Sequence, residues 1–254
     1  MLLGAGAEAD VFSSDGLTAL KRFRKTPANW NAAVHAEITY AIEALKHPNL
    51  VRVLELDVSA GCLRMEYMDG GSLADVLLSN GALHDKHILQ IITETISALC
   101  CLHENKLMHR DVKPGNIMLD SRSRASKLTD WIGNYAEYKS LQQGKPVGTP
   151  VFTAPEVAGM PHRHLIVSDT WSLGCTIINM ASGRLPWADA DAHGRTNEFM
   201  AMWQTAQGIA PPYDASAFNP ELSAFLTVCF EPDPCRRLSA QNLRKLFEPL
   251  QMRI

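Results

Sequence analysis

The sequence predicts an α+β fold in which strands come first and helices follow. Short stretches typical of strands occur at residues 3–23, 50–56 and 62–67. Apolar residues recur at helical spacing over residues 29–46 and 84–105, and a run that is apolar nearly all round follows Ser168. A sheet-forming first part and a helical second part together make an α+β protein.

The boundary between the two parts is predicted at the turn Asp69-Gly70-Gly71. At 254 residues the chain can bury a large core, either as one large domain or as two lobes. It contains no internal repeats, so we expect a single domain over residues 1–254.

Composition places the chain among ordinary globular proteins. Hydrophobic residues make up 46% and charged residues 20%, and the net charge is −3. This balance gives no electrostatic reason to expect a nucleic acid or an anionic membrane as partner. No run approaches 18 apolar residues, and the six cysteines form no C-x-x-C pair. We therefore expect a soluble cytoplasmic protein with reduced cysteines that serve in packing.

The first strands surround a loop of small residues. Residues 3–11 read LGAGAEADV, and glycines at positions 4 and 6 would let backbone N–H groups approach a phosphate. A hairpin turn explains the loop alone equally well. Lys21 ends the next strand, where a lysine on an edge strand is the simpler interpretation of the tetrapeptide by itself.

The run from His109 to Asn116 carries the strongest chemical signal and reads HRDVKPGN. Phosphoryl transfer requires a carboxylate to orient the acceptor hydroxyl, a cation to stabilise charge, and ligands for a metal ion. Asp111, Lys113 and Asn116 could supply one of each. The alternative is a polar surface turn after a helix.

Three later segments also carry motifs, and the first two have simple structural explanations when each is taken alone. Residues 148–156 read GTPVFTAPE, whose end resembles a helix start. Asp169 precedes an apolar helix and could simply be an N-cap. Residues 233–240 read DPCRRLSA, which contains Arg237.

Taken in order, these segments resemble a eukaryotic-type serine/threonine protein kinase domain. The resemblance extends from Gly4 to about Phe247, and Lys113 is the serine/threonine form of the motif. Residues 174–187 are most similar to the MAP kinase kinase kinase class. The resemblance implies a two-lobed fold. A small antiparallel β N-lobe with one main helix would span about residues 1–68, and a larger, mostly helical C-lobe about 69–254.

The resemblance also implies MgATP between the lobes and a protein substrate bearing Ser or Thr. The residues that would act in transfer are Asp111, Lys113, Asn116, Lys21, Asp130 and Thr149. Asn116 and Asp130 would hold the metal. The residues that would bind the nucleotide are Leu3, Gly4, Gly6, Val11, Ala19, Lys21, Glu37, Met65, Glu66, Met68 and Ser72.

Several of these roles have a specific form in the resemblance. Met65 would be the gatekeeper beside the adenine, which the backbones of Glu66 and Met68 would bind. Glu37 lies at the edge of the apolar stripe of residues 29–46 on a 100° wheel, so it is the candidate to pair with Lys21. Asp169 would anchor the backbone of the catalytic loop, and Arg237 would pair with Glu156.

The chain departs from the kinase pattern at two positions. Ala9 replaces the third glycine of the loop, and Ile132 stands where the family motif has the glycine of D-F-G. A β-branched residue tolerates positive φ poorly. We expect either that Gly133 makes the turn instead or that the segment is less able to flip. These departures support an alternative function, a pseudokinase that binds nucleotide and acts as a scaffold.

Regulation and specificity are less defined by the sequence. Lys145 stands where many kinases carry a phosphorylated residue, so loop phosphorylation would fall on Tyr135, Tyr138 or Ser140, or be absent. Gly115 argues against basic substrates, because many kinases that prefer them have glutamate there. Thr149 and the Ala154-Pro155-Glu156 segment favour a peptide acceptor over a small molecule. Upstream or scaffold proteins are possible partners.

Overall fold

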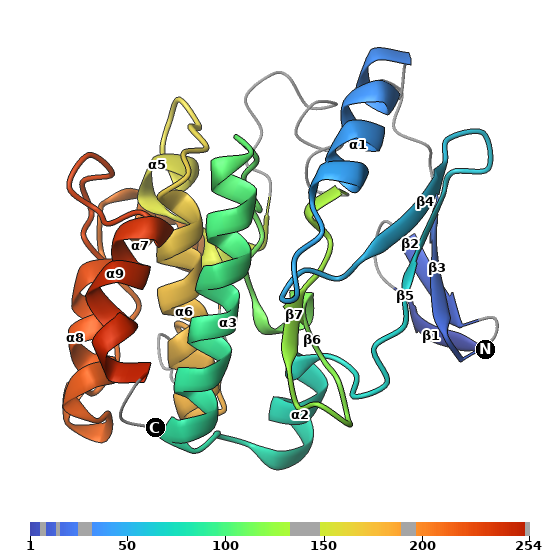
Figure 1. Ribbon diagram of the computed structural model, residues 1–254. Coiled ribbons are helices and arrows are strands. Elements are labelled where there is room, and N and C mark those ends of the chain that lie inside the picture. The colour runs from blue at the N-terminus through green and yellow to red at the C-terminus, as the bar shows by residue number, and fades with distance from the viewer. Residues whose placement is uncertain (6–8, 14–15, 25–31, 133–147, 189–196, 252–254) are drawn as a thin grey trace.

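Five antiparallel strands and one helix form the N-lobe (Figure 1). The computed structural model describes residues 1–5, 9–13, 16–24, 32–132, 148–188 and 197–251. The strands are β1 (Leu2–Ala5), β2 (Ala9–Ser13), β3 (Thr18–Phe23), β4 (Val53–Asp57) and β5 (Cys62–Glu66), in the spatial order β1-β2-β3-β5-β4. The helix is α1 (Ala32–Ala44).

The register of the sheet fixes which residues face the cleft. β3 lies between β2 and β5, with Lys21 opposite Val11 on one side and Leu63 on the other. Ala19, two residues earlier on the same face, lies opposite Met65. Because residues two apart on a strand point to one side, Ala19 and Lys21 face the cleft together.

Helix α1 packs on the sheet through the predicted apolar stripe. Ile38, Ala41 and Leu45 are buried, whereas Glu37 and Glu43 are exposed. The prediction that these positions share one face is therefore confirmed.

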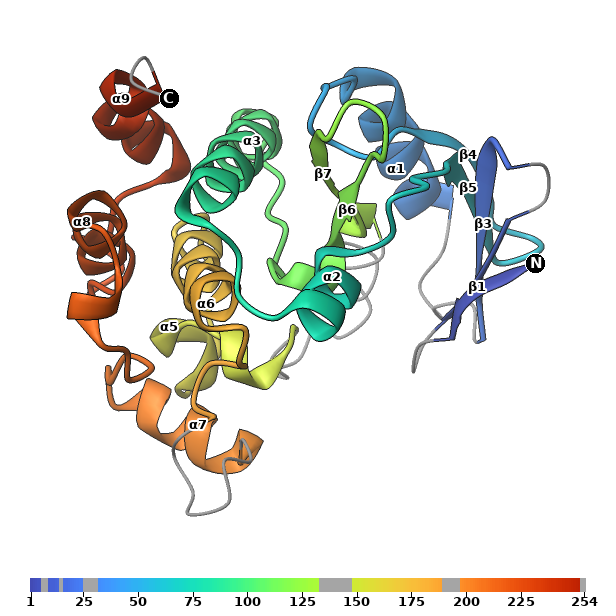
Figure 2. The same ribbon diagram turned by 90° about the horizontal axis from the view of Figure 1, so that it is seen from below.

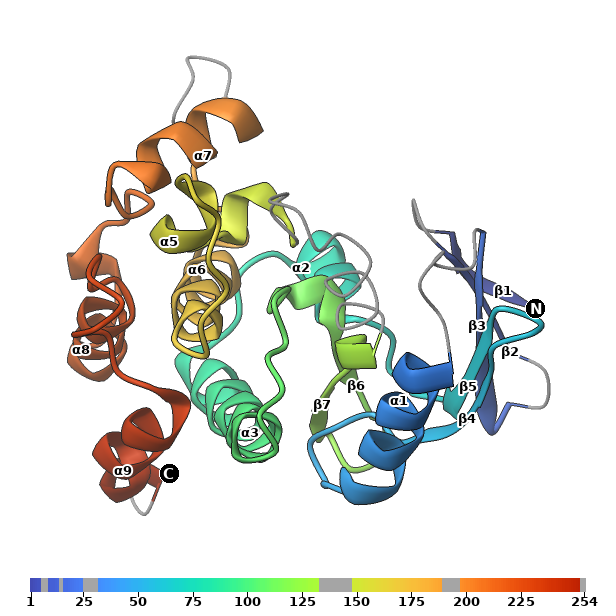
Figure 3. The ribbon, with the colours of Figure 1, turned by 90° about the horizontal axis from the view of Figure 1, so that it is seen from above.

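The C-lobe is mostly helical and contains one short hairpin. Its elements are α2 (Leu73–Asn80), α3 (Asp85–Glu104), η1 (Pro114–Asn116), β6 (Ile117–Leu119), β7 (Ser126–Leu128), η2 (Pro150–Phe152), α5 (Pro155–Ala158), α6 (Ser168–Ser182), α7 (Glu198–Ala206), η3 (Ala215–Ala217), α8 (Pro220–Cys229) and α9 (Ala240–Gln251). Figures 2 and 3 show α3 beside α6, with α8 and α9 on the outer side. The α+β class and the two-lobed arrangement predicted from the sequence are confirmed.

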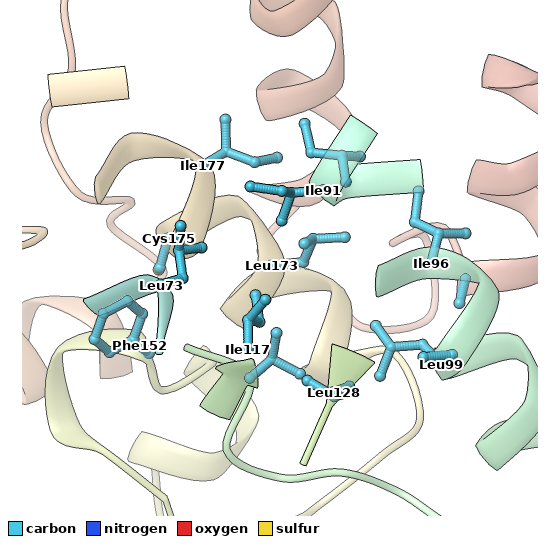
Figure 4. Packing of buried hydrophobic residues seen from close by; sticks show 14 of the residues in the cluster. Leu73, Ile91, Ile96, Leu99, Ile117, Leu128, Phe152, Leu173, Cys175 and Ile177 are labelled. Carbon is cyan, nitrogen blue, oxygen red and sulfur yellow. The ribbon is translucent and has the colours of Figure 1, made fainter. Parts of the chain in front are cut away.

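Helix α6 is the central element of the C-lobe core. Every residue from Ser168 to Met180 is buried, as the apolar run predicts. Leu173, Cys175 and Ile177 of α6 lie among side chains from α2, α3, β6, β7 and η2 (Figure 4). The helix ends at Gly183, whose φ of 68° places it in the left-handed region that glycine favours.

The cysteines only partly follow the prediction. All six are free thiols, and Cys100, Cys175 and Cys229 are buried in the core. Burial raises the pKa of Cys100 to about 11. Cys235 is exposed, so it is not a packing residue. No helix in the described part of the chain is long and apolar enough to cross a bilayer.

Candidate active site

A cavity of about 410 Å³ lies between the N-lobe sheet and the C-lobe. Its volume is in the range of small-molecule and cofactor sites. The lining residues that the sequence singled out are Leu3, Gly4, Val11, Ala19, Lys21, Met65, Glu66, Met68, Ser72, Asn116 and Asp130. Gly6 lies outside the described residues.

The walls of this cavity include apolar side chains that the sequence analysis did not assign. Val53 and Leu63 come from the sheet, and Met118 comes from the β6 strand of the C-lobe. The alternation of apolar residues along the strands was a usable signal for Val53 and Leu63. Met118 could be assigned only once β6 was placed under the cleft.

The segment that joins the lobes is held by backbone contacts. The Gly70 N–H donates to the Leu119 carbonyl at 3.0 Å, and the Leu119 N–H donates to the Gly71 carbonyl at 2.9 Å. A Cβ on Gly70 would lie 2.6 Å from the Leu119 oxygen, so this approach requires glycine.

Ser72 begins α2 with a capping box. The Asp75 N–H donates to Ser72 Oγ at 3.2 Å, and the Ser72 N–H donates to Asp75 Oδ2 at 3.1 Å. Both side chains border the cavity. Asp75 is thus a second polar residue at the position where Ser72 is predicted to lie near a ribose.

Asp130 reaches the cleft through an unusual backbone turn. Its φ is +72°, and its carboxylate pairs with the ammonium of Lys21 from β3. The next two residues, Trp131 and Ile132, are helical and buried. Asp130 itself therefore adopts the left-handed conformation in this segment. An Asp adopts this conformation more readily than a β-branched residue does. Gly133 lies outside the described residues, so the two alternatives stated for Ile132 stay predictions.

Asn116 is oriented by the backbone and side chain of Asp111. Its Nδ2 donates to the Asp111 carbonyl at 2.8 Å and to Asp111 Oδ2 at 2.9 Å. Because both contacts use the nitrogen, the amide oxygen points elsewhere. An amide oxygen here and the carboxylate of Asp130 across the cavity are the oxygen ligands that Mg²⁺ prefers, so the residues present fit this ion.

The catalytic loop is anchored to Asp169 at the start of α6. This fully buried carboxylate accepts the N–H groups of His109 at 2.9 Å and Arg110 at 2.8 Å. It also accepts a hydrogen bond from His103 Nε2 at 2.8 Å. Burial raises the pKa of Asp169, but the hydrogen bond and charge of His103, with His109, outweigh it, so the net pKa is lowered. Asp169 thus anchors the loop backbone, as predicted, and is more than an N-cap.

His109 links the catalytic loop to the segment that carries Asp130. Its Nδ1 accepts the Asp111 N–H at 3.3 Å, so its Nε2 carries the proton and donates to the Thr129 carbonyl at 2.7 Å. Thr129 directly precedes Asp130. The two segments that are expected to act on one substrate are therefore joined through a buried imidazole.

Thr149 completes a polar cluster around Asp111. Its hydroxyl donates to Asp111 Oδ1 at 2.8 Å and accepts a hydrogen bond from the Lys113 ammonium. The ammonium also lies 2.7 Å from Asp111 Oδ2. Thr149 therefore contacts both Asp111 and Lys113, with which it is predicted to act in transfer.

Gly148 permits this approach of Thr149. Its φ is +111°, and a Cβ at this position would lie 2.6 Å from the Arg110 carbonyl. Only a glycine can therefore bring the following threonine this close to the catalytic loop.

A model of the protein kinase domain matches residues 1–246 of the chain. The chain belongs to the protein kinase family. It is 34% identical to serine/threonine-protein kinase SSK22 of Saccharomyces cerevisiae over 84% of the chain and 17% of that protein. It is 33% identical to MAP kinase kinase kinase wis4 of Schizosaccharomyces pombe, over 83% of the chain and 16% of that protein. It is 34% identical to mitogen-activated protein kinase kinase kinase 4 of Mus musculus, over 89% and 14% respectively.

These matches confirm the predicted resemblance to serine/threonine kinases and to the MAP kinase kinase kinase class in particular. The chain spans less than a fifth of the length of these relatives. The comparison therefore concerns the kinase domain and not the remainder of those proteins.

The ion pair expected between Glu156 and Arg237 is present in this kinase. Arg237 Nη1 and Nη2 lie 2.8 and 3.0 Å from the two Glu156 oxygens. Both side chains are buried, and Ser168 Oγ donates to Glu156 Oε1 at 2.6 Å. The pair joins α5, which contains Glu156, to the segment before α9.

Among the described residues predicted to bind the nucleotide, Glu37 is the one that does not line the 410 Å³ cavity. It lies on the exposed side of α1, beside a second cavity of about 220 Å³ that Trp131 and Ile132 also border. The ammonium of Lys21 pairs with Asp130 in this arrangement. The pairing of Glu37 with Lys21 stays a prediction. Tyr135, Tyr138, Ser140 and Lys145 lie outside the described residues.

Proposed function

We propose that this kinase domain transfers the γ-phosphoryl group of ATP to serine or threonine hydroxyls of a protein substrate in intracellular signalling. The observation that carries the proposal is the position of the Asp111, Lys113 and Thr149 cluster beside the nucleotide-sized cavity. The cluster and the cavity are joined through Asn116, which lines the cavity and donates a hydrogen bond to Asp111.

Asp111 is the group that orients the acceptor. Each of its carboxylate oxygens has two lone pairs, so it can accept a substrate hydroxyl in addition to the contacts already described. Held by Asn116 and Thr149, it would direct the hydroxyl oxygen at the phosphorus and take up the proton as the new bond forms.

Lys113 and Lys21 supply positive charge at the two ends of the transfer. Lys113, beside Asp111, would stabilise the transferring phosphoryl group, and Lys21, from the N-lobe sheet, would hold the phosphates of ATP. Mg²⁺ bound by Asp130 and Asn116 would neutralise the phosphate oxygens. The ammonium of Lys21 already pairs with Asp130, so binding would exchange this contact for nucleotide and metal.

The adenosine would lie against the strip from Met65 to Ser72. Ala19 and Val11 from the sheet and Met118 from β6 offer apolar surfaces on either side of a flat ring. The backbone groups of Glu66 and Met68 would bind its edge.

The finer assignments are also proposals. We infer that the whole of residues 1–254 forms one kinase domain that acts in the cytoplasm, upstream of other kinases as its MAP kinase kinase kinase relatives suggest. Protein substrates and upstream or scaffold proteins would be its partners.

The test is the substitution Asp111→Asn. Asn is of the same size but cannot take up the hydroxyl proton, so transfer from labelled ATP should fall by roughly 10²–10⁴-fold. Nucleotide affinity, measured by calorimetry, should stay near the wild-type value. Asp85→Asn, an exposed position at the start of α3, is the matched control and should leave both quantities unchanged.

Two results would contradict the proposal. Equal transfer by wild type and Asp111→Asn would remove Asp111 from the mechanism. Nucleotide binding by the wild type with no Mg²⁺-dependent transfer to any Ser or Thr would favour a pseudokinase.

A further inference from the structure

An ion pair behind the cleft connects the two lobes. Lys127 Nζ of β7 lies 2.8 and 2.9 Å from the two carboxylate oxygens of Glu66, the last residue of β5. The side chains are 22% and 27% exposed. β7 belongs to the C-lobe and β5 to the N-lobe sheet, so this contact crosses the boundary (Figure 1).

The Glu66 end of the pair is fixed within the N-lobe. Its Oε1 accepts the Arg52 N–H at 2.7 Å, and its own N–H donates to the Arg52 carbonyl at 2.9 Å. A carboxylate with donors from both sides cannot follow the lysine if the lobes separate.

The Lys127 end is fixed to the C-lobe through the neighbouring residue Ser126. On one side of Lys127, Ser126 donates to Glu94 Oε2 of α3 from both its N–H, at 2.7 Å, and its hydroxyl, at 2.6 Å. On the other side, the Leu128 carbonyl accepts the Val51 N–H at 2.9 Å, so β7 also contacts the N-lobe segment that leads into β4. β7 then leads through Thr129 to Asp130.

We propose that Lys127 and Glu66 form a lobe tether that limits opening of the cleft and thereby slows the departure of nucleotide. The inference rests on the proposed function, since it requires a nucleotide in the cleft. Opening the lobes would pull Nζ away from both oxygens, because Ser126 holds β7 to α3 while Arg52 holds Glu66 in the N-lobe. A charge-assisted bidentate contact therefore opposes that motion. Lys127 is a positioning residue, and it contacts no reacting atom.

The experiment removes each end of the tether. Lys127→Met removes the charge and keeps a side chain of similar length. Glu66→Gln removes the negative charge but keeps an acceptor for the Arg52 N–H. Release of a fluorescent ADP analogue, followed by stopped flow, should be faster by about 3–10-fold in either variant, with Kd raised in proportion. The double variant should match the single ones, and Lys127→Arg should restore slow release. For Lys127→Met, the value of kcat should be equal to or above that of wild type.

Arg64→Met is the matched control. It breaks the pair between Arg64 Nη2 and Glu55 Oε2, 2.6 Å apart, which joins β5 to β4 within one lobe. Because that pair does not cross the cleft, its loss should leave nucleotide release unchanged.

The outcomes separate this inference from the function on which it rests. If the wild type binds no nucleotide, the proposed function fails. If the wild type binds and transfers normally while Lys127→Met releases ADP at the wild-type rate, the tether is refuted and the function stands. Effects of the two single variants that add in the double variant, or equal acceleration by Arg64→Met, would also refute the tether.

Discussion

Asp169 and Asp130 are two carboxylates of one active site that are held in opposite ways. Asp169 is 1% exposed and takes three hydrogen bonds, all from its own lobe. The side chain of Asp130 is 24% exposed and pairs with Lys21 from the other lobe. The first arrangement is complete when the C-lobe folds, whereas the second can exchange its partner. The difference suggests that the catalytic loop is fixed in advance and that the nucleotide side is assembled on binding.

The largest expected effect on stability comes from removing the Asp169 carboxylate. Asp169→Ala leaves His103 and two backbone N–H groups buried without their acceptor, so the free energy of unfolding should fall by about 3–5 kcal/mol. Urea denaturation followed by circular dichroism measures this change. A loss below 1 kcal/mol would show that the loop does not depend on this anchor.

The same anchor has a defined pH dependence. The net pKa of Asp169 is lowered from its ordinary value of 3.8. Its contribution to stability is therefore fully present above that value and is lost as the pH falls through the lower, folded pKa. The difference in stability between wild type and Asp169→Ala should shrink in the same window.

For the ion pair between Lys21 and Asp130, we expect a large loss of activity and a small loss of stability. Lys21→Met should lower kcat/KM by roughly 10²–10³-fold, because a positioned charge on the phosphates is lost. The free energy of unfolding should change by no more than about 1 kcal/mol, since the pair is partly solvated. Kinetics with varied ATP and a parallel urea titration test both halves. A large loss of stability would show that the ion pair between Lys21 and Asp130 serves mainly to stabilise the fold.

The smallest expected effect concerns His164, which borders a small cavity together with Arg110 and Asp111. Burial, followed by the charge of Arg110, lowers its pKa to about 4 despite the opposing effects of Asp169 and Glu156; His162 also lowers it. The unfolded chain therefore binds this proton more readily between pH 6.5 and about 4, and stability is lost as the pH falls through that window.

His164→Gln should reduce this loss. The expected difference is about 1–2 kcal/mol between pH 6.5 and 4, after allowance for solvent around a partly exposed ring. Thermal or urea unfolding at a series of pH values measures it. Parallel pH profiles for wild type and variant would contradict the prediction.

The sequence predicted those parts of the site whose chemistry restricts the residue type. Asp111, Lys113 and Asn116 stand within eight positions, so their proximity follows from local structure alone. The contact between Glu156 and Arg237 joins residues far apart in the chain, and it could be expected only because the kinase resemblance supplied it.

Other contacts had no signal of that kind. Lys127 and Glu66 are ordinary charged residues of two strands, and only the packing of β7 behind β5 brings them together. Glu94 and Ser126 meet because β7 packs against α3. The environment of His164 depends on side chains from four separate segments, which no periodicity in one segment reveals.

The turn at Asp130 has a consequence for how its carboxylate can move. Because Asp130 itself adopts the left-handed conformation, position 132 needs no backbone freedom, and Ile132 is 1% exposed in the core. Burying such a side chain contributes about 1.5–3 kcal/mol. A backbone flip that turned Asp130 away from the cleft would have to take Trp131 and Ile132 out of the core. Such a flip and local unfolding of this segment would therefore be one event.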